Sequence, residues 1–237
     1  MDAVTRVNLH CHSLFSHDGA LTPEALADNL AAAGVRYAAL TDHDTLEGLP
    51  RFQEALKRRG IGYIPGVEIT ARCDGREMHL LGLGFDADHS ELKATLLSLR
   101  QARDSGLHSI AGALRNAGTH PPDNDDDDPP ASNAAPDGQL DIGAAIDLVH
   151  RAGGRAFLAH PFTHEASAGA LDTLLPQLKA LGLDGIEAIY EPFTEAQRAA
   201  LVDLARRHNL LVSAGTDVHA AGAAGRPVYG IDMPVGL

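Results

Sequence analysis

Short apolar segments alternate along the chain with longer segments in which apolar residues recur every three or four positions. The short segments are typical of buried strands, and they cover about residues 6–10, 37–43, 62–70, 78–85, 155–161, 185–190 and 210–219. The longer segments are typical of amphipathic helices, and they cover about residues 22–34, 49–60, 90–117, 142–152, 171–178 and 194–208. Repeated β–α units of this kind predict a parallel sheet, either open or closed as a barrel.

Capping residues support the first and the last of these helices. Thr22 stands at the N-cap position before Pro23, and Gly34 provides a stop. Thr194 and Gln197 have the spacing of a capping box. These signals predict where the two helices begin.

Residues 119–138 interrupt the alternation. They contain five prolines and six aspartates, including the run DNDDDDPP. Such a composition cannot bury enough apolar surface to offset the entropy of ordering it, so we expect a flexible acidic surface loop. A calcium loop is the alternative, but the segment lacks the glycine and glutamate spacing of such a loop. Apart from this loop, we expect residues 1–237 to form a single domain.

The charge of the chain limits its partners. Its 32 acidic and 19 basic residues give a formal net charge of −13. A protein that binds a long nucleic acid through its phosphates normally shows a basic patch, and the sequence shows none. A cluster of divalent metal ions can nevertheless make an acidic protein locally positive. We expect no obligate protein partner, and no membrane contact because no apolar run approaches the roughly 18 residues of a membrane helix.

The sequence also predicts a cytoplasmic location. The N-terminus has no basic segment followed by an apolar core. Cys11 and Cys73 are the only cysteines, and a single pair is no disulfide framework, so we expect two reduced thiols. Cys11 lies between two histidines, but its side chain should point to the opposite strand face, so we do not predict it as a metal ligand.

Side chains able to bind a metal occur at or near the C-terminal ends of nearly all the predicted strands. In chain order they are His10, His12, His43, Glu68, His79, His160, Asp217 and His219. In a β/α barrel these strand ends converge on one face, where such enzymes place their sites. His10 and His12 are two residues apart, so both project from one strand face, about 6–7 Å apart along the strand. This suits two ligands of one metal ion.

Each of these features has an ordinary explanation when taken alone. A single His-x-His pair in a strand arises by chance, the TDHD sequence at Thr41–Asp44 is compatible with a turn and helix cap, and His160 suits a histidine hydrogen-bonded to backbone. Their common position at strand ends favours one shared site. His164 follows closely enough to approach it, whereas we interpret the other histidines as surface or packing residues: His89, His108, His120, His150 and His208.

Other catalytic motifs are missing from the sequence. It contains no G-x-S-x-G elbow, no Walker loop and no H-E-x-x-H helix. The sequence GLGFDA at Gly82 lacks the third glycine of a dinucleotide-binding fingerprint. A Ser-His-Asp triad would leave most of the histidines unexplained.

The motifs together resemble the PHP (polymerase and histidinol phosphatase) family over nearly the whole chain. They are His10-x-His12, Asp18-Gly19, LTDHD at Leu40–Asp44, GVE at Gly66–Glu68, His79 before LLGLG, AHP at Ala159–Pro161, GIE at Gly185–Glu187 and TDVH at Thr216–His219. The resemblance implies an α/β fold, a distorted seven-stranded β/α barrel of the TIM-like kind. It also implies a site of two or three metal ions and hydrolysis of phosphoesters.

The resemblance also assigns ligands to each metal ion. It places His10, His12, Glu68 and Asp217 on a first ion. Glu68 bridges to a second ion held by His79 and His160, and Asp18, His43 and His219 hold a third. Catalytic roles fall to Glu68, Asp217 and His219. Mixed imidazole and carboxylate ligands fit manganese, zinc or iron better than magnesium or calcium.

The sequence departs from the nucleotide-hydrolysing members of the family in three respects. Asp18 stands six rather than five residues after His12, which makes the intervening His17 an alternative ligand. The acidic loop replaces an inserted helical domain. Glu191-Pro192-Phe193 stands where many relatives have a polar residue and a histidine. Further candidates for orienting the ligands or contacting substrate are Asp42, Asp44, Glu187 and Arg226, with the two aspartates expected to accept hydrogen bonds from metal-binding imidazoles.

We therefore expect a metal-dependent phosphoesterase that hydrolyses a small phosphomonoester, such as a nucleotide, with hydroxide generated on the metal ions. A 5′-to-3′ exonuclease acting on short RNA or DNA, or a histidinol-phosphatase-like enzyme, is the alternative. A different class, a non-catalytic metal-binding scaffold, is disfavoured because all nine ligand positions hold ligating residues.

Overall fold

The structure is a computed structural model that describes residues 4–116, 140–165, 167–219 and 227–235, and the side chains of residues 106–116 are not among those described. Some sequence predictions lie outside these residues: the acidic loop at 119–138, the substrate candidate Arg226, and the surface or packing roles of His108 and His120.

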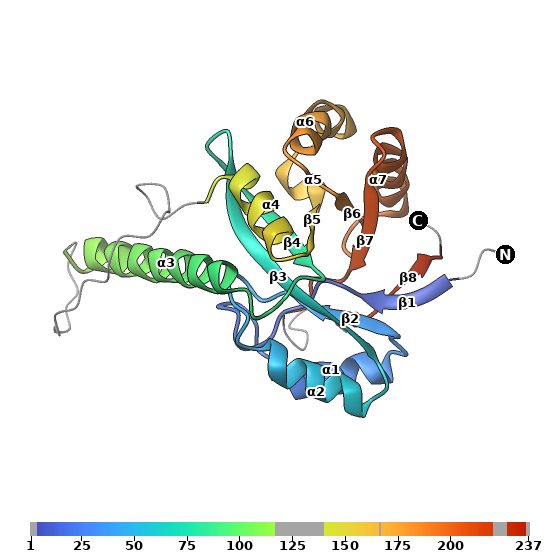
Figure 1. Ribbon diagram of the computed structural model, residues 1–237, viewed down its shortest axis with the longest axis horizontal. Helices are drawn as coiled ribbons and strands as arrows, with labels where there is room; N and C mark the ends of the chain where they lie inside the picture. The colour runs from blue at the N-terminus through green and yellow to red at the C-terminus, as the bar shows by residue number, and fades with distance from the viewer. Residues whose placement is uncertain (1–3, 117–139, 166, 220–226, 236–237) are drawn as a thin grey trace.

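Eight strands form one sheet in the order β7-β6-β5-β4-β3-β2-β1-β8 (Figure 1). Their bounds are β1 Val4–Asn8, β2 Tyr37–Leu40, β3 Gly62–Cys73, β4 Arg76–Leu83, β5 Arg155–Leu158, β6 Gly185–Tyr190, β7 Leu211–Gly215 and β8 Ile231–Pro234. The sheet curls until β1 and β7 meet, where the N–H of Leu9 donates to the carbonyl of Ala214 at 2.9 Å. The predicted distorted β/α barrel is confirmed.

The barrel has one strand more than predicted and is not fully parallel. β8 pairs antiparallel with β1 at the edge of the sheet, and it was not predicted because Asp232 and Pro234 interrupt its apolar residues. β4 runs antiparallel to β3 and β5, so the expectation of a parallel sheet was wrong there. The cause is the Asp74-Gly75 turn, in which both residues have positive φ. Such a two-residue turn joins antiparallel strands, because a parallel crossover needs a dozen or more residues.

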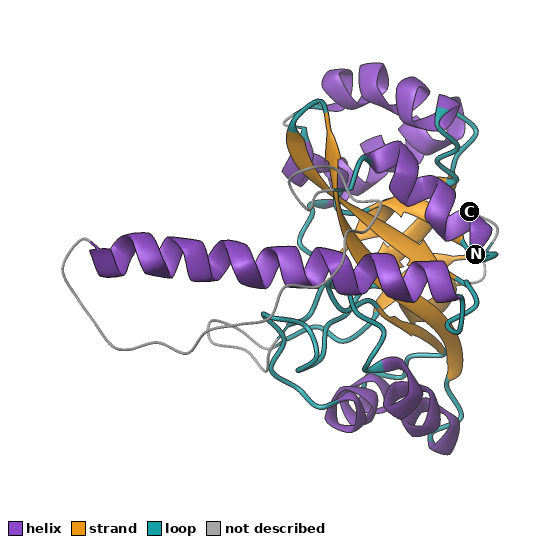
Figure 2. Cartoon of the chain, turned by 60° about the vertical axis from the view of Figure 1, so that its left-hand side comes forward, coloured by secondary structure: helices purple, strands orange, loops and turns teal. Residues whose placement is uncertain are grey.

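The described part of the chain forms seven helices around this sheet (Figure 2). They are α1 Pro23–Ala32, α2 Leu49–Arg58, α3 Ser90–Asn116, α4 Ile142–Arg151, α5 Pro161–His164, α6 Ala168–Ala180 and α7 Glu195–Arg207. Both predicted caps are confirmed: Thr22 Oγ1 accepts from the N–H of Ala25, and Thr194 and Gln197 form the capping box. The sequence analysis missed the single turn of α5, which follows directly on β5.

Helices and sheet share a continuous apolar core. Leu26 and Leu30 of α1, Phe52 of α2, Leu92 of α3 and Ile146 of α4 are all buried in it. The first half of α3 packs against the barrel, and its second half extends away from the rest of the molecule (Figures 1 and 2). Across the described ranges, no helix combines the length and apolar character needed to span a membrane.

Candidate metal centre

All nine predicted metal ligands lie together at one end of the barrel. Most stand in the irregular segments that follow β1, β2, β5 and β7, a few residues beyond the strand ends where the sequence placed them. His79 lies within β4, as predicted. Glu68 lies in the middle of β3 rather than at its end, because β3 continues into the hairpin as far as Cys73.

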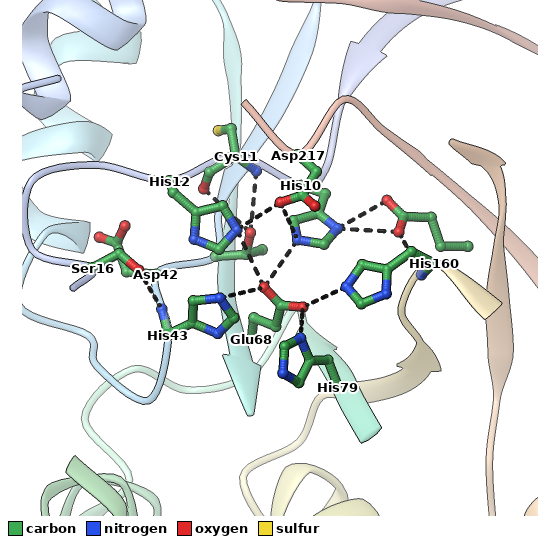
Figure 3. A network of polar contacts seen from close by, with 12 residues as sticks. His10, Cys11, His12, Ser16, Asp42, His43, Glu68, His79, His160 and Asp217 are labelled. Atoms are coloured by element: carbon green, nitrogen blue, oxygen red, sulfur yellow. Dashed lines mark hydrogen bonds and ion pairs between the residues drawn. The ribbon is translucent and has the colours of Figure 1, made fainter. Parts of the chain in front are cut away.

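Glu68 is the hub of the cluster, and five imidazoles surround its fully buried carboxylate (Figure 3). Its Oε2 lies 3.0 Å from His10 Nε2, 3.2 Å from His12 Nε2 and 3.5 Å from His43 Nε2. Its Oε1 lies 2.9 Å from His79 Nδ1 and 3.0 Å from His160 Nε2. A buried carboxylate needs a compensating positive charge nearby, and in this site the histidines occupy the positions from which that charge must come.

Two further carboxylates extend the cluster on either side of His12. Asp217 Oδ1 lies 3.0 Å from His12 Nε2 and 3.2 Å from His10 Nε2. Asp18 Oδ2 lies 3.1 Å from His219 Nε2 and 3.5 Å from His43 Nε2. The ring of His12 lies between these two carboxylates and stacks on the ring of His219, with the ring centroids 4.2 Å apart.

In three of these histidines Nε2 faces the carboxylates, and the hydrogen-bond partner of Nδ1 determines which of the two nitrogens carries the hydrogen. His219 Nδ1 lies 2.8 Å from the carbonyl oxygen of Asp217, which can only accept. His10 Nδ1 lies 3.0 and 3.1 Å from the two carboxylate oxygens of Glu187. Each Nδ1 must therefore carry the hydrogen, and in a neutral imidazole Nε2 then carries a lone pair.

His160 follows the same rule through Thr163. The Thr163 hydroxyl donates its only hydrogen to the carbonyl of His160 and lies 2.7 Å from His160 Nδ1, so it accepts from that nitrogen. The Nε2 lone pair of His160 then faces Glu68 Oε1 at 3.0 Å. Two lone pairs at this distance repel each other unless a cation lies between them, so the arrangement fits a metal ion.

Buried polar atoms without hydrogen bonds give a second test of this fit. Within the described residues, both ring nitrogens of His12 lack a hydrogen-bond partner, and so do His43 Nδ1, His79 Nδ1 and Asp217 Oδ1. Buried polar groups are nearly always hydrogen-bonded, and a concentration of exceptions marks a missing ion or a functional site. The donor set of imidazole nitrogens and carboxylate oxygens suits manganese, zinc or iron.

The ligand atoms fall into three groups, each within 4.8 Å of one another. The first is His10, His12, Glu68 and Asp217, the set assigned to the first ion. The second is His43, Glu68 and His79, and His160 is attached to it through Glu68 Oε1. The third is Asp18, His43 and His219 with the addition of His12. His43 is therefore shared by two groups, which the sequence did not predict.

The choice between Asp18 and His17 favours Asp18. The Asp18 carboxylate faces His219 and His43, and Ser16 Oγ donates to its second oxygen at 2.7 Å. The His17 side chain is 50% exposed, and its Nε2 lies 3.8 Å from Asp18 Oδ2. His17 therefore lies at the edge of the centre rather than within it.

Neighbouring charges set the protonation of the centre. Burial alone would lower the pKa of His12, but the carboxylates of Asp217 and Glu68 outweigh it and raise this pKa to about 9. Burial alone would raise the pKa of Glu68, yet the surrounding histidines hold it well below its ordinary value. The carboxylates therefore remain ionised at neutral pH, and their negative potential favours a cation among the imidazoles.

Glu187 is buried and joins two ligands, as the sequence suggested for an orienting residue. Besides contacting His10 Nδ1, its Oε2 accepts from the backbone N–H of His160 at 2.9 Å. Carboxylates in this position fix the tautomer and orientation of a ligating histidine.

Within the described residues Asp42 and Asp44 accept no hydrogen bond from an imidazole, so this expectation was wrong. Asp42 accepts from the backbone N–H and the hydroxyl of Ser13, at 2.6 and 2.7 Å. Asp44 accepts from the N–H of Thr70 at 2.8 Å and from Arg103. The two carboxylates instead fasten the loops that carry Asp18 and His43.

The sequence analysis missed two residues that line the same cavity. The hydroxyl of Tyr190, at the end of β6, donates to Asp217 Oδ2 at 2.7 Å. Burial and the charge of Asp217 raise the pKa of this phenol, so it stays protonated. Tyr190 and Thr163 line a cavity of about 260 Å³ together with seven of the predicted ligands. Only their closeness in sequence to the GIE and AHP motifs could have indicated them.

The open question about His164 is also answered by the geometry. Its ring centroid lies 5.0 Å from that of His160, and its Nε2 accepts from the backbone N–H of His79 at 3.4 Å. His164 therefore packs behind two ligands without joining a metal-binding group. Cys11 behaves as predicted: its thiol is buried and donates to the carbonyl of Ala39.

Comparisons with known proteins agree with this geometry. Residues 8–125 match the PHP domain family. The chain is 33% identical to a 5′-3′ exoribonuclease of Haemophilus influenzae, over 90% of each protein. It is 29% identical to a 3′,5′-nucleoside bisphosphate phosphatase of Chromobacterium violaceum, over 98% of this chain and 93% of that protein. A solved amidohydrolase structure from the same organism, with bound sulfate and no metal, has a TM-score of 0.80 and 26% identity over 97% of this chain and 92% of that one.

Proposed function

The chain belongs to the PHP domain family, and we propose that its centre holds two or three divalent metal ions and hydrolyses a small phosphomonoester of the nucleotide class. The observation that carries the proposal is the set of histidine Nε2 atoms turned toward Glu68, Asp217 and Asp18 while Nδ1 is engaged elsewhere. Divalent metal ions lower the pKa of bound water and offset negative charge on phosphoryl oxygens.

We assign the ligands in three sets. The first set is His10, His12, Glu68 and Asp217, and the second is Glu68, His79 and His160 with His43 at its edge. The third set is Asp18, His43 and His219, with His12 beside it. Glu68 has one oxygen turned to each of the first two sets, which suits a bridging carboxylate. Asp217 and His219 also line the cavity, which supports their proposed catalytic roles.

The chain's own residues prepare this centre for reaction. Glu187 and Thr163 hold the Nδ1 hydrogens of His10 and His160, so that each Nε2 is available as a ligand. Tyr190 holds one oxygen of Asp217 and leaves the other facing His10 and His12. The ligands are thus oriented in advance, which reduces the reorganisation needed during the reaction.

The relatives' names point to a nucleotide, and the size of the cavity favours a small substrate. At about 260 Å³ the cavity lies just below the range of about 300–1,000 Å³ that is typical of small-molecule sites. The two relatives are a nucleoside bisphosphate phosphatase and an exoribonuclease. A 5′-to-3′ exonuclease acting on short RNA is the second candidate, favoured by the 33% identity to the Haemophilus enzyme. The formal charge of −13 opposes a long polyanion.

The wider predictions remain part of the proposal. We propose that residues 1–237 act as a single domain, supported by the one sheet that runs from β7 to β8. A cytoplasmic location is supported by Cys11 and Cys73, which are both free. Manganese, zinc and iron are the metals that the donor set suits, and Mn²⁺ is the practical first choice for an assay.

Phosphate release in the presence of Mn²⁺ tests this function. The substrates are adenosine 3′,5′-bisphosphate, histidinol phosphate, an aryl phosphate and a 5′-phosphorylated oligonucleotide. His12→Ala should abolish hydrolysis, whereas His150→Ala, a control at a partly exposed histidine paired with Asp184, should not change it. Mononucleotides released only from the oligonucleotide would select the exonuclease. No hydrolysis of any substrate by Mn²⁺-loaded protein would contradict the proposal.

A further inference from the structure

The loop that carries His43 is held in a strained conformation. Asp44, directly after His43, has a φ of 51°, in the left-handed region that residues with side chains rarely adopt. Its backbone N–H donates to the carbonyl of Glu68 at 2.9 Å, which joins the loop to β3 beside the bridging carboxylate. The position of His43 therefore depends on whatever holds Asp44.

A buried contact with α3 holds the Asp44 side chain. The carboxylate is 0% exposed, and its Oδ2 accepts from Nη2 of Arg103. The same Nη2 donates to Thr70 Oγ1 at 2.7 Å, and the N–H of Thr70 donates to Asp44 Oδ1 at 2.8 Å. Arg103, Asp44 and Thr70 thus form a closed set of contacts between α3, the loop after β2, and β3.

Asp44 and Thr70 each lie next to a residue of one metal-binding group. Asp44 follows His43, and Thr70 stands opposite His79 in the β3–β4 pairing. His43 and His79 belong, with Glu68, to one of the three ligand groups. A shift of the Arg103 guanidinium would therefore displace His43 and His79, although it touches neither of them.

Arg100 provides a natural contrast on the same helix. It reaches the same loop, where its Nη1 lies 2.9 Å from Glu47 Oε1. Both side chains of that pair are exposed, at 37% and 59%. An exposed pair is screened by water and holds its partners weakly, whereas a buried carboxylate cannot lose its counterion without moving or taking up a proton.

We infer that Arg103 is a positioning residue of the centre, which fixes His43 through Asp44 and so determines whether the metal ion at the His43 site is bound. The inference rests on the proposed function only in taking the His43 group as a metal site. It assigns to the middle of α3 a part in assembling the centre, although none of the described side chains of α3 belongs to a ligand group.

Manganese binding by purified full-length variants tests this role. We would compare wild type, Arg103→Met, Arg103→Lys, Arg100→Met and His43→Ala by isothermal titration with Mn²⁺ after chelation. His43→Ala should lose one equivalent of Mn²⁺ or bind it at least tenfold more weakly. Arg103→Met should reproduce that loss, Arg103→Lys should restore much of it, and Arg100→Met should match wild type. Circular dichroism would show whether each variant keeps its fold.

Full Mn²⁺ binding by folded Arg103→Met, with the loss present in His43→Ala, would overturn the inference. If Arg103→Met does not fold, Asp44→Asn replaces it, because the amide keeps the acceptor for Thr70 and removes the ion pair. Wild-type Mn²⁺ binding by Asp44→Asn would then overturn the inference. Phosphate release by wild type is measured in parallel: an inactive wild type whose Mn²⁺ binding still depends on Arg103 contradicts the proposed function alone.

Discussion

A histidine lies about 3 Å from a carboxylate both at the surface and in the centre, yet the two arrangements differ in chemistry. At the surface, His208 Nε2 lies 2.6 Å from Asp172 Oδ1, and Asp172 also pairs with Arg207. In the centre, His160 Nε2 lies 3.0 Å from Glu68 Oε1. Distance alone does not distinguish a surface ion pair from a metal ligand.

The difference lies in the second ring nitrogen and in burial. Thr163 takes the Nδ1 hydrogen of His160, so in the neutral imidazole the Nε2 lone pair faces the carboxylate. Glu68 is buried and shared by five imidazoles, whereas the Asp172 side chain is 38% exposed and has a cation beside it. A histidine thus becomes a ligand when its neighbours fix its tautomer and exclude water.

The largest effect expected from this comparison is that of Glu68→Gln. The neutral amide removes the charge shared by the imidazoles, so we expect kcat/KM to fall on the order of 10³-fold, the size of effect seen when an electrostatic stabiliser is lost. Glu77→Gln is the matched control, because Glu77 lies 3.6 Å from His79 but is 58% exposed. Equal activity of the two variants would remove the distinction between buried and exposed carboxylates.

Glu187→Gln should have a smaller effect. The amide can present its NH₂ group to His10 Nδ1, which no longer fixes the hydrogen on that nitrogen. Loss of such an orienting carboxylate costs about 10–100-fold in metal affinity or activity. Titration with Mn²⁺ and phosphate release measure the two quantities. Glu191→Gln, four residues later and outside the cavity lining, serves as the control and should bind Mn²⁺ as wild type does.

Tyr190→Phe should reduce activity less again, by about tenfold, because it removes one hydrogen bond to a charged group, worth about 1.5 kcal/mol or more. The ring and its packing remain, so the folded state should persist. Phosphate release and thermal unfolding would be measured beside Tyr37→Phe, a substitution at an exposed tyrosine. An unchanged kcat/KM would show that Asp217 is oriented without Tyr190.

Asp172→Asn tests the surface half of the comparison and should have the smallest effect. Exposed ion pairs contribute about 0–1 kcal/mol to the free energy of unfolding, so stability should change within that range. Mn²⁺ binding and phosphate release should equal those of wild type. A loss of bound Mn²⁺ here would mean that the surface pair also belongs to a metal site.

The sequence predicted the barrel and the ligand cluster because both depend on order along the chain. His10-x-His12, His43, His160 and Asp217 follow apolar strands, and parallel strand ends meet at one face. The strand at β4 was predicted, but its antiparallel direction was not, although Asp74-Gly75 signals a two-residue hairpin, because the β–α alternation in the rest of the chain favoured a parallel sheet. β8 was missed because Asp232 and Pro234 interrupt its apolar residues.

Contacts between distant segments could not be predicted in the same way. Asp42 and Asp44 stand beside a ligand in sequence, so a role in orienting imidazoles was a reasonable expectation. Their partners, Ser13 and Thr70, become apparent only once the loops are packed together. Tyr190 likewise meets Asp217 across 27 residues, and nothing in the local sequence distinguishes it from a core tyrosine.

The number of metal ions bound per chain tests the central claim most directly. After equilibration with Mn²⁺ and removal of the free ion, elemental analysis by mass spectrometry should find two or three ions per wild-type chain. Glu68→Gln should bind at least one ion fewer, and Glu77→Gln should bind as many as wild type. Fewer than one ion per wild-type chain, or equal numbers in all three proteins, would contradict a metal centre built around Glu68.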